Sequence, residues 1–172
     1  MKIAVLIANG SEEIEALTPV DVLRRANADV DLISVSGPFA LGSHGISIKA
    51  DKVVQDVDFD DYNAIVVPGG MPGATNIASD KKVLEGLKRA LDRDRLVASI
   101  CASPAVVLAQ NGLLGQNKAT CYPAPQFVSA LGCAYTGKDV EISNNIITAN
   151  GPKSAFKFSL AICDYLGLNP KF

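Results

Sequence analysis

Short apolar runs alternate with longer amphipathic stretches along this chain, and the two kinds of stretch separate strands from helices. The apolar runs have the length and the β-branched content of strands that are covered on both faces. The amphipathic stretches carry apolar residues at helical spacing. This alternation predicts an α/β fold, a three-layer sandwich in which a mostly parallel sheet has helices on both faces. The predicted strands are 3–8, 30–35, 64–67 and 96–100, and the predicted helices are 11–27, 74–93 and 156–166.

Shorter elements complete the pattern. Ser103 is expected to cap a helix that starts at Pro104 and stops at 111–112, because serine and proline suit the first two positions of a helix. Asparagines at 144–145 favour a hairpin turn. The other expected elements are a turn at 37–38, an extended segment at 46–50, a polar linker at 56–62, short strands at 118–121, 133–136, 140–143 and 146–150, and a short helix at 125–131.

Two of the predicted helices contain a break signal. Pro19 lies inside the helix at 11–27 and is expected to kink or restart it, since proline removes one bond from the helical ladder. The stretch 74–93 is expected to break near Ser79 and Asp80. Its two parts are then predicted to be separate helices.

Composition narrows the class of protein. The 172 residues predict a single domain over 1–172 with a full core. With 16 Lys and Arg against 18 Asp and Glu and no basic run, neither nucleic acid nor an anionic membrane is an expected partner. The apolar start is too short for a signal peptide, and no run reaches membrane-spanning length. Glycine motifs typical of nucleotide binding are absent, so nucleotide or phosphate binding has no specific support.

The four cysteines are Cys101, Cys121, Cys133 and Cys163. They form no C-x-x-C pair, and the chain has one histidine to join them, so neither a zinc site nor a disulfide framework is indicated. No metal is therefore expected. Free thiols of this kind favour a reducing, cytoplasmic location.

Cys101 stands where a buried strand turns directly into a helix. Small residues flank it at the offsets that a hydrolase nucleophile elbow uses, with Ser99 and Ser103 in the glycine positions. Such a turn presents the side chain, and a helix N-terminus favours the thiolate, so a lowered thiol pKa is expected. The alternative is a cysteine that fills space at the end of a strand.

Ligands of open parallel sheets bind at the carboxyl ends of the strands. In this chain that rule brings together the loops 8–12, 68–70, 101–102 and 150–152. The N–H groups of Gly69, Gly70 and Ala102 are then expected to form an oxyanion hole beside Cys101. An ordinary glycine turn after a strand is the alternative for 69–70.

Acidic residues follow the first strand. Helical spacing puts Glu12 and Glu15 on one side and turns Glu13 away, so one of the first two is a candidate neighbour of Cys101. A thiolate would raise the pKa of that glutamate and keep it protonated. Spacing does not choose between the two, and acidic first-turn residues also complement a helix dipole. Aspartates at 56–60 imitate a calcium loop but lack its glycine and its bidentate glutamate, which favours a solvated linker.

The chain resembles the DJ-1/ThiJ/PfpI family, in its DJ-1-like branch, within the class I glutamine amidotransferase-like superfamily. The resemblance implies a flavodoxin-like sandwich that forms homodimers and needs no cofactor. It also implies that Cys101 is the reactive thiol, that Glu15 is its protonated partner, and that Gly70 and Ala102 are the backbone donors. The matching segments are 9–15, 19–26, 67–73, 99–104, 119–123 and 150–152.

Departures from the family pattern concern histidine. PfpI-like proteases have histidine directly after the nucleophile, where this chain has Ala102, so the base of a Cys–His hydrolase is missing. Animal members of the DJ-1 branch have histidine before a proline, where this chain has Tyr122, whose hydroxyl can donate a hydrogen bond. His44, the one histidine, borders the active site by analogy with the family, with a position across the dimer as one possibility.

Two functions follow from the resemblance. The first is a glyoxalase or deglycase that converts methylglyoxal, or its glycated adducts, to lactate through a Cys101 hemithioacetal with Glu15 as proton carrier. The second is an oxidative-stress sensor or chaperone in which Cys101 is oxidised to sulfinate.

Overall fold

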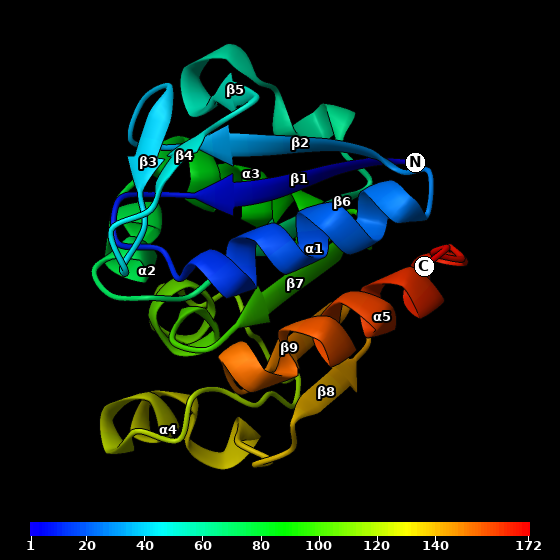
Figure 1. Ribbon diagram of the computed structural model, residues 1–172. Helices are drawn as coiled ribbons and strands as arrows, with labels where there is room; N and C mark the ends of the chain where they lie inside the picture. Colours follow the sequence, from blue (N-terminus) through cyan, green and yellow to red (C-terminus); the bar gives the residue numbers. More distant parts are fainter.

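A computed structural model describes residues 1–172 and shows a seven-stranded sheet in the order β5-β2-β1-β6-β7-β9-β8 (Figure 1). The strands are β1 Lys2–Ile7, β2 Asp29–Ser34, β3 Phe39–Leu41, β4 Ser47–Lys49, β5 Lys52–Val53, β6 Ala64–Val67, β7 Leu96–Ile100, β8 Val140–Ser143 and β9 Ile146–Ala149. The α-helices are α1 Glu13–Arg25, α2 Gly73–Ala78, α3 Lys81–Asp92, α4 Pro125–Leu131 and α5 Ala155–Leu166. Shorter helical turns are η1 Val54–Asp56, η2 Phe59–Asp61, η3 Pro104–Leu108, η4 Ala109–Asn111, η5 Gly132–Ala134 and η6 Pro152–Ser154.

Every neighbouring pair in the large sheet is parallel except β8 and β9, which form a hairpin. Strands β3 and β4 form a separate antiparallel hairpin. Helices α1 and α5 lie side by side on one face of the sheet, and α2, α3, η3 and α4 lie on the other (Figure 1). The predicted mostly parallel three-layer sandwich is confirmed, and its topology is flavodoxin-like.

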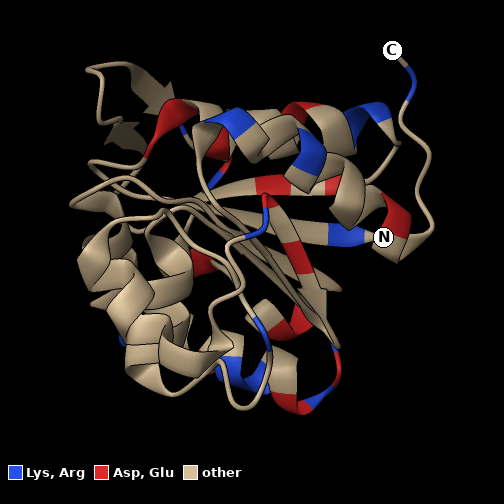
Figure 2. Ribbon diagram, turned by 90° about the horizontal axis from the view of Figure 1, so that it is seen from below, with Lys and Arg blue, Asp and Glu red and all other residues tan.

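The sequence explains the layers. Strands β1, β6 and β7 are buried on both faces because apolar side chains point alternately into two hydrophobic cores. Asp80 caps α3 by accepting a hydrogen bond from the Val83 N–H at 3.1 Å, which confirms the predicted break in 74–93. Figure 2 shows Lys and Arg interspersed with Asp and Glu along the ribbon. No helix combines the length and apolar character needed to cross a membrane.

The first helix differs from its prediction in two ways. It begins at Glu13 rather than residue 11, because the Glu12 carboxylate caps it by accepting from the Glu15 N–H at 2.9 Å. It also continues through Pro19 to Arg25, so the expected restart is wrong. The proline removes one bond of the ladder, while burial of α1 against the sheet and α5 holds the helix together.

The polar linker predicted at 56–62 is wrong. Phe59 and Tyr62 are 2% and 1% exposed and belong to the core. The acidic residues between them are held by other elements, since Asp60 pairs with Arg89 of α3 at 3.0 Å and with Arg93 at 2.9 Å. The segment is therefore an ordered part of the fold.

Two of the short predicted strands are absent. The stretches 118–121 and 133–136 meet in one isolated bridge, Ala119 with Tyr135, and residues of the second form η5. Thr120 donates its N–H to the Thr148 hydroxyl at 2.9 Å rather than to a strand backbone, so no ladder forms. The strands at 140–143 and 146–150, their turn at Asn144, and the helices at 125–131 and 156–166 are confirmed within a residue or two.

Candidate active site

Cys101 is the first residue after β7 and has a φ of 65°, which is rare for a residue with a side chain. Its N–H donates to the Ala149 carbonyl at 2.9 Å, and its carbonyl accepts from the Tyr122 N–H at 2.8 Å. These two bonds hold the strained turn in place and leave the thiol partly exposed. Ser103 is not the expected N-cap, because its backbone is already helical and its hydroxyl donates to the Pro68 carbonyl at 2.5 Å.

Glu15 is the glutamate that the fold brings to Cys101. Its side chain points inward from the first turn of α1 and is fully buried. One carboxyl oxygen, Oε2, accepts the Gly69 N–H at 2.8 Å, and the carboxyl lies close enough to the Cys101 thiol for each group to shift the pKa of the other. The other oxygen, Oε1, has no hydrogen-bond partner. The structure thus selects Glu15 over Glu12, whose carboxylate caps the helix.

Burial makes Glu15 a weak acid. It raises the pKa of Glu15 from 4.5 to about 7, because an ionised carboxyl is poorly solvated there, and the negative charge of Glu12 adds to the rise. The hydrogen bonds from Cys101 and Gly69 favour the ionised form and limit the effect. Glu15 can therefore exchange a proton near neutral pH.

Burial also raises the pKa of the Cys101 thiol, and the adjacent Glu15 carboxylate raises it further, to about 12. The N–H groups of Gly70 and Ala102 act in the opposite direction. The expected lowering of the thiol pKa by the helix N-terminus is therefore wrong while Glu15 is ionised. The charge that opposes the thiolate disappears when Glu15 holds the proton, so the pair can be described as one shared proton between sulfur and carboxyl.

The glycine loop after β6 closes the site. A Cβ on Gly69 would lie 2.6 Å from the Cys101 Cβ and 2.7 Å from Glu15 Oε2, so only glycine fits between the two reactive groups. Gly70 has a φ of +84° and, with Ala102, directs an N–H to the sulfur. Gly69 is not the expected third donor to an oxyanion, because its N–H is already bonded to Glu15.

His44 lies in the loop between β3 and β4 and contacts Glu13 rather than Cys101. Its Nδ1 is 2.9 Å from Glu13 Oε2, and its N–H donates to Glu13 Oε1 at 2.7 Å. Burial raises the pKa of Glu13, but the bonds from His44 outweigh burial and lower it to about 2; the same contact raises the pKa of His44. Glu13 is turned away from the thiol, as its spacing predicts.

Glu12, Glu13 and His44 offer three ligand atoms within 4.8 Å of one another, a set that could hold a metal ion. His44 is exposed, and its ring and the Glu13 carboxylate already satisfy each other. The prediction that the protein needs no metal stays a prediction.

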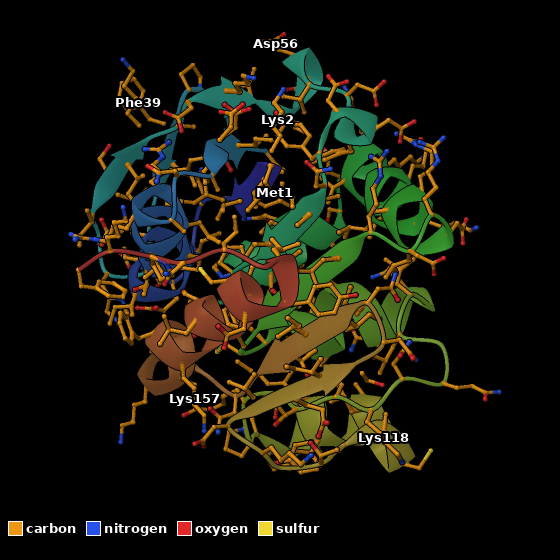
Figure 3. All side chains as sticks on the ribbon, turned by 90° about the vertical axis from the view of Figure 1, so that its right-hand side faces the viewer. Met1, Lys2, Phe39, Asp56, Lys118 and Lys157 are labelled. Atoms are coloured by element: carbon orange, nitrogen blue, oxygen red, sulfur yellow. The ribbon has the colours of Figure 1, made fainter.

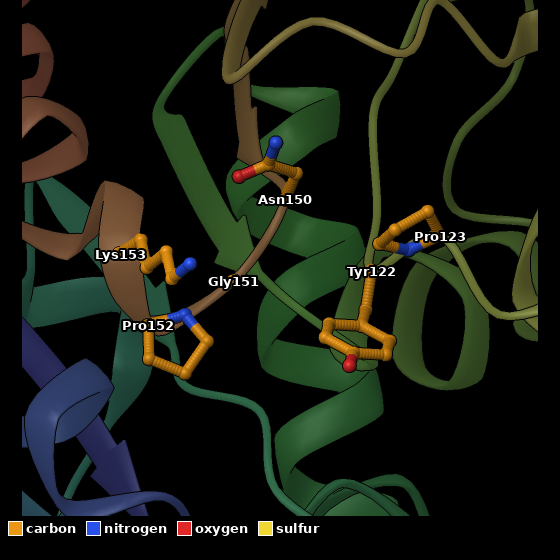
Figure 4. A pocket seen from close by; sticks show the side chains of 6 residues that line it. All are labelled: Tyr122, Pro123, Asn150, Gly151, Pro152 and Lys153. Carbon is orange, nitrogen blue, oxygen red and sulfur yellow. The ribbon is translucent and has the colours of Figure 1, made fainter.

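A cavity of about 430 Å³ lies beside the turn that carries Cys101 (Figure 4). Tyr122 lines one side with its ring, and Lys153 of η6, just before α5, stands across from it. The sequence identified the loop at 150–152 as the end of a strand but did not identify Lys153 as a site residue. The one feature of the sequence that could have pointed to Lys153 is its position next to this loop. The lining residues are Tyr122, Pro123, Asn150, Gly151, Pro152 and Lys153.

Comparison with known proteins places this geometry in a family. A model of the DJ-1/PfpI family matches residues 1–165. Protein DJ-1 homolog B of Arabidopsis thaliana is 35% identical over 168 residues, which are 96% of this chain and 38% of that protein, so the chain spans less than half of this relative. Glutathione-independent glyoxalase DJR-1.2 of Caenorhabditis elegans is 32% identical over 156 residues, 91% of this chain and 83% of that protein.

A solved structure agrees with these relatives. The oxidised DJ-1 of Toxoplasma gondii superposes with a TM-score of 0.92 at 40% identity and covers 96% of this chain and 90% of its own. The chain therefore belongs to the DJ-1/PfpI family.

Proposed function

We propose that this protein is a cofactor-independent glyoxalase that converts methylglyoxal to lactate. One observation carries the proposal: a fully buried carboxyl, Glu15, has a pKa raised to about 7 and contacts the thiol of Cys101. A carboxyl with such a pKa suits a reaction in which one proton is taken up and given back near neutral pH. The name of the C. elegans relative, a glutathione-independent glyoxalase, supports the same chemistry.

The first step forms a carbon–sulfur bond. The Glu15 carboxylate takes the proton of the Cys101 thiol as the sulfur attacks the aldehyde carbon, and the electron pair of the C=O bond moves to the oxygen. The N–H groups of Gly70 and Ala102, which point at the sulfur, are placed to stabilise this oxyanion. The oxyanion takes the proton of Glu15, which gives a hemithioacetal and a Glu15 carboxylate.

The second step moves a proton between carbons. The Glu15 carboxylate removes the proton of the former aldehyde carbon, and the electron pair shifts to form an enediolate whose charge lies on the oxygen of the neighbouring carbon. Glu15 then gives this proton to the neighbouring carbon, while the hydroxyl proton of the former aldehyde carbon passes to the enediolate oxygen, which leaves a lactoyl thioester on Cys101. One carbon is oxidised and the next is reduced, so no external oxidant or reductant enters. Water cleaves the C–S bond and releases lactate and the thiol.

Methylglyoxal adducts of amines or thiols can enter the same first step. Such an adduct either releases free methylglyoxal or transfers its former aldehyde carbon directly to the Cys101 thiol, and the amine or thiol leaves. Deglycation is thus part of the proposal as a second substrate class. The partner of the protein is then a small dicarbonyl or a glycated side chain.

The test is lactate formation from methylglyoxal in buffer without glutathione. Cys101→Ser and Glu15→Ala should each abolish it, because one loses the nucleophile and the other the proton carrier. Cys133→Ser, a change of an exposed cysteine outside the site, is the matched control and should keep full activity. Retained turnover in either site variant, or a strict requirement for glutathione, would contradict the mechanism.

A second candidate function is oxidation sensing, supported by the oxidised state of the T. gondii relative. Two equivalents of peroxide would convert the Cys101 thiolate to sulfinate and release two waters, and protonated Glu15 would donate a hydrogen bond to a sulfinate oxygen. A sensor or chaperone of this kind would work in the cytoplasm, where its four free thiols stay reduced. Intact-mass analysis after mild peroxide should show a two-oxygen adduct that Cys101→Ser loses; unchanged uptake in that variant would refute it.

A further inference from the structure

The cavity lined by Tyr122 and Lys153 is joined to the reactive turn through the backbone of Cys101. The Tyr122 N–H donates to the Cys101 carbonyl, and the Cys101 N–H donates to the carbonyl of Ala149, the residue before Asn150. Both walls of the cavity are therefore attached to the residue that carries the thiol. Neither Cys101 nor Glu15 lines the cavity itself, so a molecule bound there leaves these two residues in place.

Lys153 is the one charged residue of the cavity, and it makes no ion pair. The nearby lysines are neutralised, since Lys157 pairs with Asp139 at 3.2 Å and Lys138 with Glu141 at 2.9 Å. Asp139 accepts a hydrogen bond from the side-chain amide of Asn150, a cavity residue, at 3.3 Å and is already paired with Lys157. A free ammonium group therefore faces an opening that no carboxylate of the protein occupies.

The wall opposite Lys153 is formed by the ring of Tyr122. Gly151 approaches the Tyr122 ring so closely that a Cβ there would lie 3.3 Å from its Cδ2. The Asn150 side chain is fixed by the Ser154 hydroxyl, which donates to Oδ1 at 2.6 Å. Figure 4 shows the Lys153 side chain extending along Gly151 on the side of the cavity away from the Tyr122 ring. The site therefore offers an aromatic surface and a cation on opposite sides.

The size of the cavity does not suit methylglyoxal alone. A volume of about 430 Å³ lies in the range of pockets that enclose ligands much larger than a molecule of five heavy atoms. A larger substrate would place its carbonyl at Cys101 and its remaining part against Tyr122 and Lys153.

We propose that the cavity is a substrate subsite for an anionic group, a carboxylate or a phosphate, attached to the α-oxoaldehyde on which Cys101 acts. This inference rests on the proposed glyoxalase function and adds a substrate class to it. Lys153 is then a specificity residue that binds the anion, and Tyr122 packs against the body of the substrate.

The kinetic test compares substrates that differ in charge. Wild-type kcat/KM should be about fivefold higher for para-carboxyphenylglyoxal than for phenylglyoxal, the size of one partly exposed ion pair, and salt should reduce the ratio. The phosphate ester of hydroxypyruvaldehyde, compared with methylglyoxal, tells whether phosphate or carboxylate is preferred. Lys153→Gln should remove the preference for the charged substrate of each pair. Lys81→Gln, which removes an equal charge outside the cavity, should keep the preference.

A binding test separates the inference from the proposed function. In amide NMR titrations, benzoate or inorganic phosphate should shift the Gly151 and Lys153 signals of the wild type with saturation, whereas neutral benzamide should not, and Lys153→Gln should abolish the shifts. Three results would each overturn the subsite. Neither anion binds with saturation, or kcat/KM is equal for the charged and the neutral substrate of each pair, or the preference for the charged substrate survives in Lys153→Gln. Loss of all oxoaldehyde turnover with intact anion binding would instead overturn the glyoxalase function.

Discussion

At the scale of single residues, three glutamates within one turn of α1 have three different roles. Glu12 caps the helix, Glu13 binds His44 at the surface, and Glu15 lies buried against Cys101. The environment separates their acidity, since hydrogen bonds from His44 lower the pKa of Glu13 to about 2, while burial raises that of Glu15 to about 7. One fold thus places a permanent anion and a proton carrier two residues apart.

The raised pKa of Glu15 makes stability depend on pH. Because this pKa is about 7 in the folded protein and 4.5 ordinarily, the neutral carboxyl favours the folded state below about pH 4.5, and this advantage is lost as pH rises through 7. Glu15→Gln cannot ionise, so its free energy of unfolding should exceed that of the wild type by roughly 3 kcal/mol more at about pH 8 than at about pH 4.

Urea unfolding at the two pH values measures this difference. Glu85→Gln, at an exposed position of α3, is the control and should differ from the wild type equally at both. If the free energies of unfolding of the wild type and Glu15→Gln differed by the same amount at both pH values, the pKa of Glu15 would not be raised in the folded protein.

At the scale of elements, the segment 56–62 between β5 and β6 contributes buried aromatic side chains to the core although most of its residues are polar. Phe59 is 2% exposed and packs against Gly86 of α3 so closely that a Cβ there would meet its ring at 2.4 Å. Phe59→Ala should therefore destabilise the protein by about 3–5 kcal/mol, the usual cost of a buried aromatic. Thermal or urea unfolding measures it. Asp56→Ala in the same segment is exposed and should cost little, and equal effects of the two changes would restore the interpretation of a solvated linker.

The sequence pattern was enough to predict those elements whose structure is determined by residues close to them in the chain. Apolar periodicity located β1, β6, β7 and β9, and the Asp80 cap located the break between α2 and α3. The prediction failed where a segment is ordered by residues distant in the chain. Arg89 and Arg93 form ion pairs with the segment 58–61, and the Thr148 hydroxyl accepts a hydrogen bond from the segment 118–121.

The candidate site shows the same division between local and distant information. The position of Cys101 in a strand-to-helix turn followed from the residues around it. The choice of Glu15, the use of the Gly69 N–H and the raised thiol pKa depend on contacts across 54 residues of chain and more. Lys153 could not be recognised because its lack of an ion pair is a property of the folded surroundings.

At the scale of the whole molecule, the reactive pair lies at the carboxyl ends of β1, β6 and β7, where the strand order reverses and ligands of open sheets bind. Several exposed apolar residues lie on α1 and on the β3–β4 hairpin beside this edge. The β3–β4 hairpin is bonded to the start of α1, with Gly10 donating to the Leu41 carbonyl at 2.8 Å. Figure 3 shows Phe39 projecting from the hairpin. The exposed apolar residues of this surface are Ile14, Leu17, Phe39, Leu41 and Ile46.

We propose that this surface is the interface of a homodimer, because an exposed apolar patch next to a functional site is typical of a binding surface. Leu17→Asp and Leu41→Asp should each convert a dimer to monomers in sedimentation velocity experiments, since an aspartate cannot be buried there without a partner. Ile142→Asp on the edge strand β8, 51% exposed and outside the surface, should leave the dimer intact. A wild type that sediments as a monomer would contradict the proposal.

The shared role of Cys101 and Glu15 is tested most directly by lactate release from methylglyoxal in glutathione-free buffer by Glu15→Gln beside the wild type. The variant keeps the nucleophile and the acceptor for the Gly69 N–H but cannot carry a proton. Its rate of lactate release should fall by about 100-fold or more, the usual contribution of a general acid–base group, while intact-mass analysis still finds methylglyoxal bound to Cys101. Release of lactate within a few-fold of the wild-type rate would contradict the account.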